Sequence, residues 1–287
     1  MLGALRQLDA RDFPALLGEV PHAPQTLYLR GELPPLGYKY LCVVGTRRMS
    51  PYGSRMCSSL IAGLAGAPVA IVSGLAMGVD AEAHKTALDV GLPTLAVLPS
   101  GVNDSVIYPR MNRPLAERIL KLGGGLLSEN EPDFKAQLYS FPQRNRIMAG
   151  MSHATLVVEA GEKSGTLITA KLALDYNRDV LAVPHEVGRE SGAGANRLLR
   201  DGATLIRSSD DLLEALHLPR REKLEQVALP LDLTHEELAI IEVLTEAYTR
   251  DEIIDGAGLS AQQANIALSS LLIRGIITER LGKIERI

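Results

Sequence analysis

Lys39-Tyr-Leu-Cys-Val-Val44, followed by Gly45-Thr-Arg-Arg-Met-Ser50 and by a helical pattern over Arg55–Leu64, is the stretch that decides the fold. Its first six residues are almost continuously apolar, which is typical of a strand that is covered on both faces. A glycine between such a strand and a helix lets the backbone come close to a ligand. The stretch therefore predicts one strand–loop–helix unit of a parallel sheet, with a ligand-binding loop at its centre.

The same pattern repeats from Tyr38 to about Leu216. Further apolar runs predict strands at Val69–Val72, Thr94–Leu98, Gly125–Leu127, Thr155–Val158, Val180–Val183 and Thr204–Ile206. The segments between them are long enough for crossover helices, at Asp80–Val90, Pro114–Leu122 and Leu167–Tyr176. Alternating strands and helices predict an α/β fold, an extended Rossmann-like, doubly wound, largely parallel sheet. Ligands of such sheets bind at the carboxyl ends of the strands, beside helix N-termini.

Four regions are predicted along the chain. Residues 1–37 are too few for a separate domain and are expected to pack on the core as an N-terminal extension, before the Rossmann-like domain of residues 38–217. Residues 218–231 are charged and contain prolines, which favours a linker. Residues 232–287 show three helical patterns and a possible hairpin, so we expect a small winged-helix domain. Its first helix begins with Thr234 and Glu237, a capping-box spacing.

The composition excludes several classes of protein. The 287 residues contain no apolar run of the about 18–20 residues that a membrane helix needs. The N-terminus lacks the layout of a signal peptide, and two cysteines are too few for a disulfide framework or a cysteine-rich metal site. We therefore expect a cytoplasmic protein that uses neither a membrane nor a metal.

The charges are unevenly distributed over a chain whose net charge is −4. From Asp232 onward there are ten acidic residues and five Lys or Arg, a net of −5, and the 24 acids and 25 bases before it leave +1. Any nucleic-acid site is therefore expected as a local patch on the larger domain. The acidic tail is expected to be a protein–protein module or an autonomous cap.

Three of the predicted loops suit an anion. Arg47 follows the first strand and could hold a phosphate with two hydrogen bonds, although a surface arginine beside a helix cap explains it equally well. Ser73 and Gly74 follow the second strand. Ser164-Gly-Thr166 opens a helix after the fifth strand, and this is the strongest anion signal of the three. None of these loops matches a Walker A or a dinucleotide-binding pattern.

Phe141-Pro-Gln-Arg-Asn-Arg146 has the composition of a single-strand site. An aromatic ring stacks on a base, and arginines beside it neutralise the flanking phosphates. The alternative is a buried phenylalanine, with Arg144 or Arg146 paired to Glu129 or Glu159. Asp80 and His84 lie four residues apart on a predicted helix, and we expect a structural hydrogen bond between them because no nucleophile has a suitable spacing.

Together, these segments resemble the DprA/Smf family of DNA-processing proteins. The resemblance extends from Leu27 to Leu216, and its ordered motifs are Val44-Gly-Thr-Arg47, Ser73-Gly-Leu-Ala-Met-Gly-Val-Asp80 with Ala83-His84, Tyr108-Pro109, Ser128-Glu129, Phe141-Pro-Gln-Arg-Asn-Arg146, Ser164-Gly-Thr-Leu-Ile-Thr-Ala170, and Gly194-Ala-Asn196 with Gly202-Ala203. It implies a homodimer that binds and protects single-stranded DNA and loads RecA recombinase onto it during natural transformation. No cofactor is implied.

Three features depart from the family pattern. The 37 residues before the core are too few for the helical domain that members often carry there, and Pro184-His185 stands where a Pro-Gly pair is usual. The predicted recognition helix Ser260–Arg274 carries a single arginine, whereas a helix that reads DNA usually carries more positive charge.

The expected DNA contacts include Arg47, Arg144 and Lys171 for phosphates, Phe141 for stacking, and backbone amides around Gly74, Ser164 and Gly165. The full predicted set is Gly45, Arg47, Arg48, Ser73, Gly74, Lys135, Phe141, Arg144, Asn145, Arg146, Ser164, Gly165, Thr166 and Lys171. The alternative is a nucleotide-hydrolysing relative with a catalytic glutamate in a P-G-G-x-G-T-x-x-E loop. Thr169 stands at that position here, which argues against an enzyme. A sensor of a small nucleotide also remains open.

Overall fold

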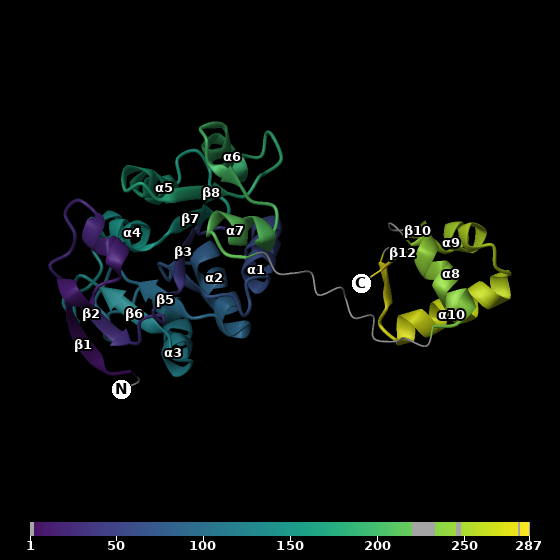
Figure 1. Cartoon of the computed structure of the whole chain (residues 1–287), viewed down its shortest axis with the longest axis horizontal. Coiled ribbons are helices and arrows are strands. Elements are labelled where there is room, and N and C mark those ends of the chain that lie inside the picture. The colour runs from purple at the N-terminus through teal and green to yellow at the C-terminus, as the bar shows by residue number, and fades with distance from the viewer. Residues whose placement is uncertain (1–2, 220–232, 245–247, 281, 287) are drawn as a thin grey trace. The chain divides into compact units, whose positions relative to one another are not determined.

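The computed structural model describes residues 3–219, 233–244, 248–280 and 282–286. The chain divides into two compact units, Met1–Arg221 and Glu222–Ile287 (Figure 1). The predicted linker 218–231 lies outside the described residues from 220 onward. No helix in the described ranges has the length and apolar character needed to span a membrane.

The larger unit is built on one nine-stranded sheet, in the order β1-β2-β6-β5-β4-β3-β7-β8-β9. All strands from β6 to β9 in that order run parallel. Their bounds are β3 Lys39–Val44, β4 Val69–Ser73, β5 Thr94–Val97, β6 Gly125–Ser128, β7 Ala154–Val157, β8 Asp179–Ala182 and β9 Thr204–Leu205. The predicted Rossmann-like, doubly wound sheet is therefore confirmed, and every predicted strand is present within one or two residues of its expected bounds.

The strand order places the topological switch point between β3 and β7. From β3 the chain moves outward in one direction through β4, β5 and β6, and it then returns to the other side of β3 for β7, β8 and β9. Loops that follow neighbouring strands diverge at such a point, so a crevice opens at the carboxyl edge. The loops after β3 and β7 are those that contain Arg47 and Ser164.

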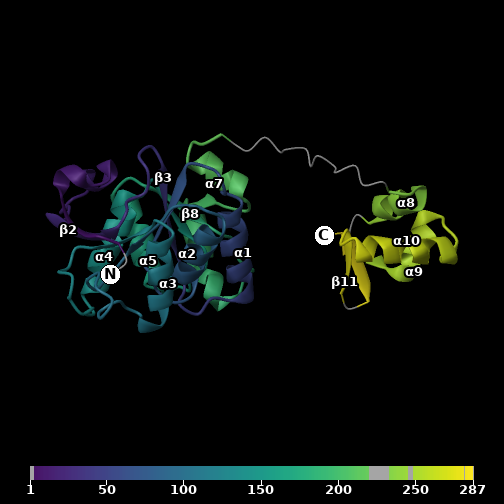
Figure 2. The ribbon, with the colours of Figure 1, turned by 90° about the horizontal axis from the view of Figure 1, so that it is seen from below.

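Helices cover both faces of the sheet (Figure 2). One face is packed by α1, α2, α3 and α7 through two apolar clusters, and the other by α4, α5 and α6 through a third cluster. The bounds are α1 Pro51–Ala62, α2 Val79–Asp89, α3 Arg113–Lys121, α4 Ser140–Met151, α5 Thr166–Asp175, α6 Ala193–Arg200 and α7 Ser209–Ala215. Burial on both faces explains why the strands are apolar without alternation.

The N-terminal segment is part of the sheet. β1 (Leu5–Asp9) pairs antiparallel with β2 (Thr26–Gly31), which pairs antiparallel with β6. Two short 3-10 helices, Ala10–Asp12 and Ala15–Glu19, lie between the two strands. Leu17, Leu27 and Leu29 are fully buried in the cluster beneath α4, so this segment completes the core on that side.

The second unit has three helices and a three-stranded antiparallel sheet, which is the predicted winged-helix architecture. The elements are α8 His235–Val243, β10 Tyr248–Thr249, α9 Arg250–Ala257, α10 Ala261–Ile273, β11 Ile277–Arg280 and β12 Lys283–Arg286, with the strand order β10-β12-β11. Each helix starts with a capping box, at Thr234, Thr249 and Ser260. Ile240, Ile253, Leu268 and Ile284 are fully buried in its own small core.

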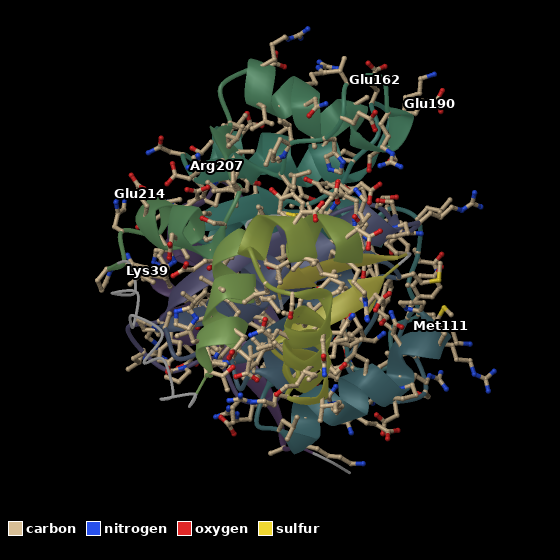
Figure 3. All side chains as sticks on the ribbon, turned by 90° about the vertical axis from the view of Figure 1, so that its right-hand side faces the viewer. Lys39, Met111, Glu162, Glu190, Arg207 and Glu214 are labelled. Carbon is tan, nitrogen blue, oxygen red and sulfur yellow. The ribbon has the colours of Figure 1, made fainter. Side chains whose placement is uncertain are left out.

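The structure differs from the sequence-based prediction at one element that matters for the site. No helix is predicted over the segment with Phe141 and Arg144, but it forms the first turns of α4. Pro142 is tolerated there because the first helical turn needs no donor from its backbone. At the periphery, Glu162 extends outward from the turn before α5, Glu190 from the 3-10 helix Glu190–Gly192 and Met111 from the 3-10 helix Arg110–Asn112 (Figure 3).

Candidate functional site

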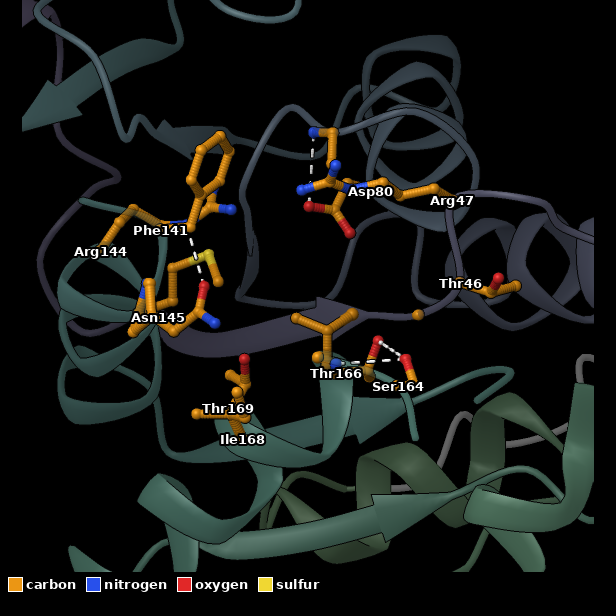
Figure 4. A pocket seen from close by; sticks show the side chains of 16 residues that line it. Thr46, Arg47, Asp80, Phe141, Arg144, Asn145, Ser164, Thr166, Ile168 and Thr169 are labelled. Atoms are coloured by element: carbon orange, nitrogen blue, oxygen red, sulfur yellow. Dashed lines mark hydrogen bonds between the residues drawn. The ribbon is translucent and has the colours of Figure 1, made fainter. Parts of the chain in front are cut away.

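A pocket of about 320 Å³ lies at the switch point of the main sheet (Figure 4). Its walls come from the β3 loop, the start of α2, the first turns of α4 and the N-terminus of α5. The lining residues are Val44, Gly45, Thr46, Arg47, Ala76, Asp80, Phe141, Pro142, Arg144, Asn145, Met148, Ser164, Gly165, Thr166, Ile168 and Thr169. The fold therefore brings together eight of the fourteen predicted residues, from segments more than 100 positions apart in the chain.

Arg47 and Phe141 meet at the rim of this pocket. The Cζ atom of Arg47 lies 5.4 Å from the centre of the Phe141 ring, a distance at which a cation is attracted to the ring face. Figure 4 shows Arg47 extending across the pocket toward Phe141. Among the described residues Arg47 has no ion-pair partner, so its guanidinium has unused donors.

Tyr108 extends the same aromatic surface. Its ring contacts Phe141 edge to face at a centroid distance of 5.5 Å, and the tyrosine is 43% exposed. Tyr108, Phe141 and Arg47 line a second, smaller hollow with Met77 and Pro109. Asn112 Nδ2 donates to the carbonyls of Leu75 and Ala76, which holds the loop of Tyr108 against the loop of β4. The prediction omitted Tyr108, although an aromatic residue after a strand end was a usable signal.

Arg144, an expected phosphate ligand, lies in the pocket lining with a largely buried guanidinium. The residue is 7% exposed, and Nη1 donates to the carbonyl oxygens of Gly74 at 2.6 Å and Val97 at 2.7 Å. Gly74 permits this approach, since a Cβ atom there would lie 1.8 Å from Nη1. Arg144 is therefore a structural residue that ties α4 to the ends of β4 and β5.

Asp80 carries the negative charge that interacts with Arg144 at the floor of the pocket. Its Oδ2 accepts hydrogen bonds from the amides of Gly74 at 3.1 Å and Ala76 at 3.4 Å. Burial raises the pKa of this carboxyl, and the nearby Arg144 and the two amides oppose that rise. The Gly74 amide, which is expected from the sequence to bind phosphate, therefore donates to Asp80 in this structure. The second carboxylate oxygen faces the pocket (Figure 4).

The N-terminus of α5 forms the polar wall opposite Asp80. Ser164 Oγ accepts from the Thr166 amide and donates to Thr166 Oγ1 at 3.0 Å. The Ser164 amide donates to the carbonyl of Gly161, so it is not the free donor that the sequence suggested. Three backbone amides are predicted to bind phosphate, at Gly74, Ser164 and Gly165. Of these, the amide of the exposed Gly165 is the one that has no hydrogen bond within the described residues.

Several other predicted contacts have structural partners instead. Ser73 Oγ donates to the carbonyl of Val43 within the sheet. Gly45 makes room for Val79, whose side chain would lie 2.4 Å from a Cβ atom at that glycine. Arg146 is bonded to Glu129 and to the carbonyl of His22, which is the alternative pairing considered for one of the two arginines. Gly45 lines the pocket, whereas Ser73 and Arg146 lie outside its lining and their side chains are bonded elsewhere.

The remaining predicted residues divide by position. Asn145 lines the pocket, and its Oδ1 accepts from Arg144 Nε at 3.1 Å. Arg48, Lys135 and Lys171 are exposed and lie outside the pocket lining. They are therefore available only to a ligand that extends beyond the pocket.

His84 does not bond to Asp80 as expected. Its Nδ1 lies 2.7 Å from Thr94 Oγ1, and the ring is fully buried between α2 and the sheet. Burial lowers the pKa of His84 from 6.5 to about 3, so the ring is neutral at physiological pH. Because the ring is enclosed and lies outside the pocket lining, it cannot reach a ligand in the pocket as a general base.

This buried histidine predicts an acid-sensitive fold. Because the unfolded chain binds a proton on this histidine near pH 6.5 and the folded protein does so only near pH 3, folding is favoured fully above pH 6.5. The free energy of unfolding then decreases as the pH falls from 6.5 toward 3. We expect the wild type to lose about 2–3 kcal/mol more unfolding free energy than His84→Leu between pH 6.5 and 4.5. Urea titrations at both pH values measure the difference. Equal losses of unfolding free energy in the two proteins would show that His84 does not cause the loss of stability at acid pH.

Comparison with known proteins identifies the family. A family model described as DNA recombination-mediator protein A matches residues 5–217. Protein Smf of Escherichia coli (strain K12) is 41% identical over 208 residues, which cover 72% of this chain and 55% of that protein. The chain thus spans about half the length of this curated relative.

Two solved structures share the fold. DNA processing protein A from Streptococcus pneumoniae superposes with a TM-score of 0.68 at 35% identity, covering 74% of this chain and 75% of that one. DNA processing protein A from Helicobacter pylori superposes with a TM-score of 0.67 at 29% identity, covering 75% and 96%. The resemblance of the sequence motifs is confirmed, and the chain belongs to the DprA/Smf family of DNA recombination-mediator proteins.

Proposed function

We propose that this protein binds single-stranded DNA at the switch-point pocket, protects it in the cytoplasm during natural transformation, and passes it to RecA without performing chemistry on it. The observation that carries the proposal is the Arg47 guanidinium over the Phe141 ring, with the exposed Tyr108 beside it. A ring face and an unpaired cation at one rim are the two groups that a single strand requires.

The polarity of the pocket supports a nucleotide ligand. Arg47 and the Gly165 amide offer donors for phosphate oxygens, and Phe141 and Tyr108 offer apolar surface for bases. Lys135, Arg48 and Lys171 lie outside this pocket, so they would contact only nucleotides that continue past it. Duplex DNA cannot place its bases against these aromatic rings, because the bases are stacked inside the double helix.

The absence of chemistry is proposed from the same residues. Asp80 is the one carboxylate in the lining of the described pocket, and its Oδ2 already accepts two amides. Thr169 occupies the position where nucleotide-hydrolysing relatives would place a glutamate, and His84 is enclosed and lies outside the pocket lining. The second Asp80 oxygen is the one carboxylate atom of the described lining that faces the pocket, so the non-catalytic proposal rests on the threonine at position 169 and on the enclosed histidine.

A small nucleotide is the second candidate ligand. The pocket volume of about 320 Å³ falls within the range of small-molecule sites. A mononucleotide that competes with a single-stranded oligonucleotide at micromolar concentration would favour a sensor, and its turnover would favour an enzyme. No competition at millimolar concentration would favour the strand-binding function.

The partners are proposed on family grounds. The homologue from Helicobacter pylori is described as having a single-stranded DNA binding mode, and it shares the fold that positions this pocket. We extend single-strand binding, RecA loading and a homodimeric assembly to this chain from its membership of the family. Stimulation of RecA filament formation on coated single strands tests the second of these.

The first test compares the two forms of DNA. We expect single-stranded oligonucleotides to bind at least about tenfold more tightly than duplexes of the same sequence, because base stacking requires unpaired bases. Affinity for the single strand should fall linearly in a plot of log K against log salt, with a slope of about −0.7 for each phosphate neutralised. Fluorescence anisotropy between 50 and 200 mM salt gives both quantities. Equal affinity for the two forms would reject the proposal.

A further inference from the structure

Helix α10 of the second unit exposes an uncharged stripe. Gln262, Ile266, Ser269 and Ile273 follow one another at spacings of four, three and four residues, and all four are exposed. Ile266 is 65% exposed and Ile273 is 88% exposed. Side chains at these spacings form a straight seam along a helix, as in pairs of interacting helices.

The opposite side of α10 belongs to the core of its own unit. Ala264, Ala267, Leu268 and Leu271 are buried against the other helices and the small sheet. The two isoleucines of the stripe are therefore not needed for the fold of this unit. From Ala261 to Ile273 the helix carries no charged residue.

The stripe is self-complementary under a two-fold rotation. The sequence from residue 266 to 273 reads Ile-Ala-Leu-Ser-Ser-Leu-Leu-Ile, which is nearly a palindrome about the midpoint between Ser269 and Ser270. Its inner apolar residues are buried or half-buried in the core of the unit, so the symmetry of the surface rests on Ile266, the two serines and Ile273. When two such helices pack antiparallel across that midpoint, Ile266 of one faces Ile273 of the other, and the reverse pair forms at the other end. An interface between identical chains requires this reciprocity. Small serines at the crossing allow the two backbones to approach.

Covering this stripe would leave few polar atoms without partners. Ser269 Oγ donates to the Asn265 carbonyl at 2.8 Å, and Ser270 Oγ donates to Glu237 Oε1 at 2.6 Å. Asn265 Oδ1 accepts from Arg250 Nη1 at 3.0 Å. Because these groups are satisfied within one chain, an apolar partner can cover them at little desolvation cost. Arg274, which follows the last residue of the stripe, is bonded to Glu237.

The charge of the surface argues against DNA as the occupant. A helix that enters a groove of DNA needs cations for the phosphates on both sides, and this stripe offers none between residues 261 and 273. We propose that the stripe Gln262, Ile266, Ser269 and Ile273 is a docking surface for the same stripe of a second copy of this chain, in antiparallel orientation.

The expected strength of this contact follows from its size. Four exposed side chains a copy are far fewer than the about 20–30 residues a side of a standard stable interface. The pairing is therefore weak between free chains, and it becomes populated at high chain concentration or where another contact already holds two copies together.

Disulfide trapping on the full chain tests both the partner and the orientation. The native Cys42 and Cys57 are buried, so they contribute little background. We expect an equimolar mixture of Ile266→Cys and Ile273→Cys chains to form a cross-linked dimer at least about tenfold faster than either chain alone. In the antiparallel pair, position 266 of one copy is offset from position 266 of the other by about 10 Å along the helix axis, which is too far for a disulfide. Oxidation at 100 μM chain without DNA, followed on non-reducing gels, gives the rates.

The matched control is Leu238→Cys, a 47% exposed apolar residue on α8 of the same unit, mixed with Ile266→Cys. Cross-linking in the test mixture no faster than in this control would overturn the proposal, as would equally fast cross-linking of either single variant. Protection of Ile266→Cys from alkylation by duplex DNA or RecA, without cross-linking between copies, would assign the stripe to that occupant instead.

A charge substitution supplies an independent measurement. Ile273→Lys places a cation against apolar surface in each half of the pair, so the concentration-dependent increase of the sedimentation coefficient should be smaller than in the wild type. Leu238→Lys should leave that increase unchanged. The opposite pattern would contradict the assignment. Neither readout involves DNA, so the outcome is independent of whether the pocket of the larger unit binds a single strand.

Discussion

Replacing Arg144 with methionine is expected to lower the free energy of unfolding by about 3–5 kcal/mol, the cost of removing one partner from a buried set of charges. The change leaves the carbonyls of Gly74 and Val97 without their donor. It also leaves the Asp80 carboxylate, already destabilised by burial, without the cation that lowers its pKa most. Thermal and urea unfolding followed by circular dichroism measure the loss.

Arg146→Met is the matched control for this prediction. It removes the same side chain two residues further along α4, where the guanidinium pairs with Glu129 at a partly exposed position. We expect a loss of at most about 1 kcal/mol there, since pairs open to solvent contribute little. If the two variants had the same stability, Arg144 would not be the buried structural residue that the hydrogen bonds indicate.

Replacing Arg47 with alanine is expected to weaken single-strand binding by about 1.5–3 kcal/mol, the range for a hydrogen bond to a charged group. This corresponds to about a 10- to 150-fold increase in Kd. The salt slope should also flatten by about 0.7, because one phosphate contact is lost. Stability should change by less than about 0.5 kcal/mol, since the side chain is exposed. Anisotropy titrations and melting curves on the same samples provide these values.

Arg55→Ala tests whether the effect is specific to the pocket. Arg55 is exposed on α1, eight residues further along, and lies outside the pocket lining. Arg55→Ala removes the same charge from the same domain as Arg47→Ala. If only a general electrostatic attraction held the DNA, both variants would therefore lose the same binding affinity. Unchanged DNA affinity in Arg47→Ala would mean that this residue is only a surface arginine beside a helix cap.

The sequence determined the fold through its hydrophobic pattern. Lys39–Val44 is a strand with the bounds that its apolar run predicted, and the other parallel strands follow because a sheet buried on both faces requires continuous apolar segments. The caps at Thr234 and Ser260 likewise predicted where α8 and α10 begin, since capping depends on residues only three positions apart. Local chemistry of this kind is readable without tertiary contacts.

The tertiary structure decided which predicted side chains remain available to a ligand. Arg47, Arg144 and Arg146 are chemically equivalent in the sequence, yet one is exposed over a ring, one is buried beneath Gly74, and one is paired with Glu129. The fate of each depends on where α4 begins and how it packs against the sheet, and neither follows from a residue's type or its neighbours. The Gly74 amide likewise donates to Asp80, because a buried donor bonds to the acceptor that the fold places within reach.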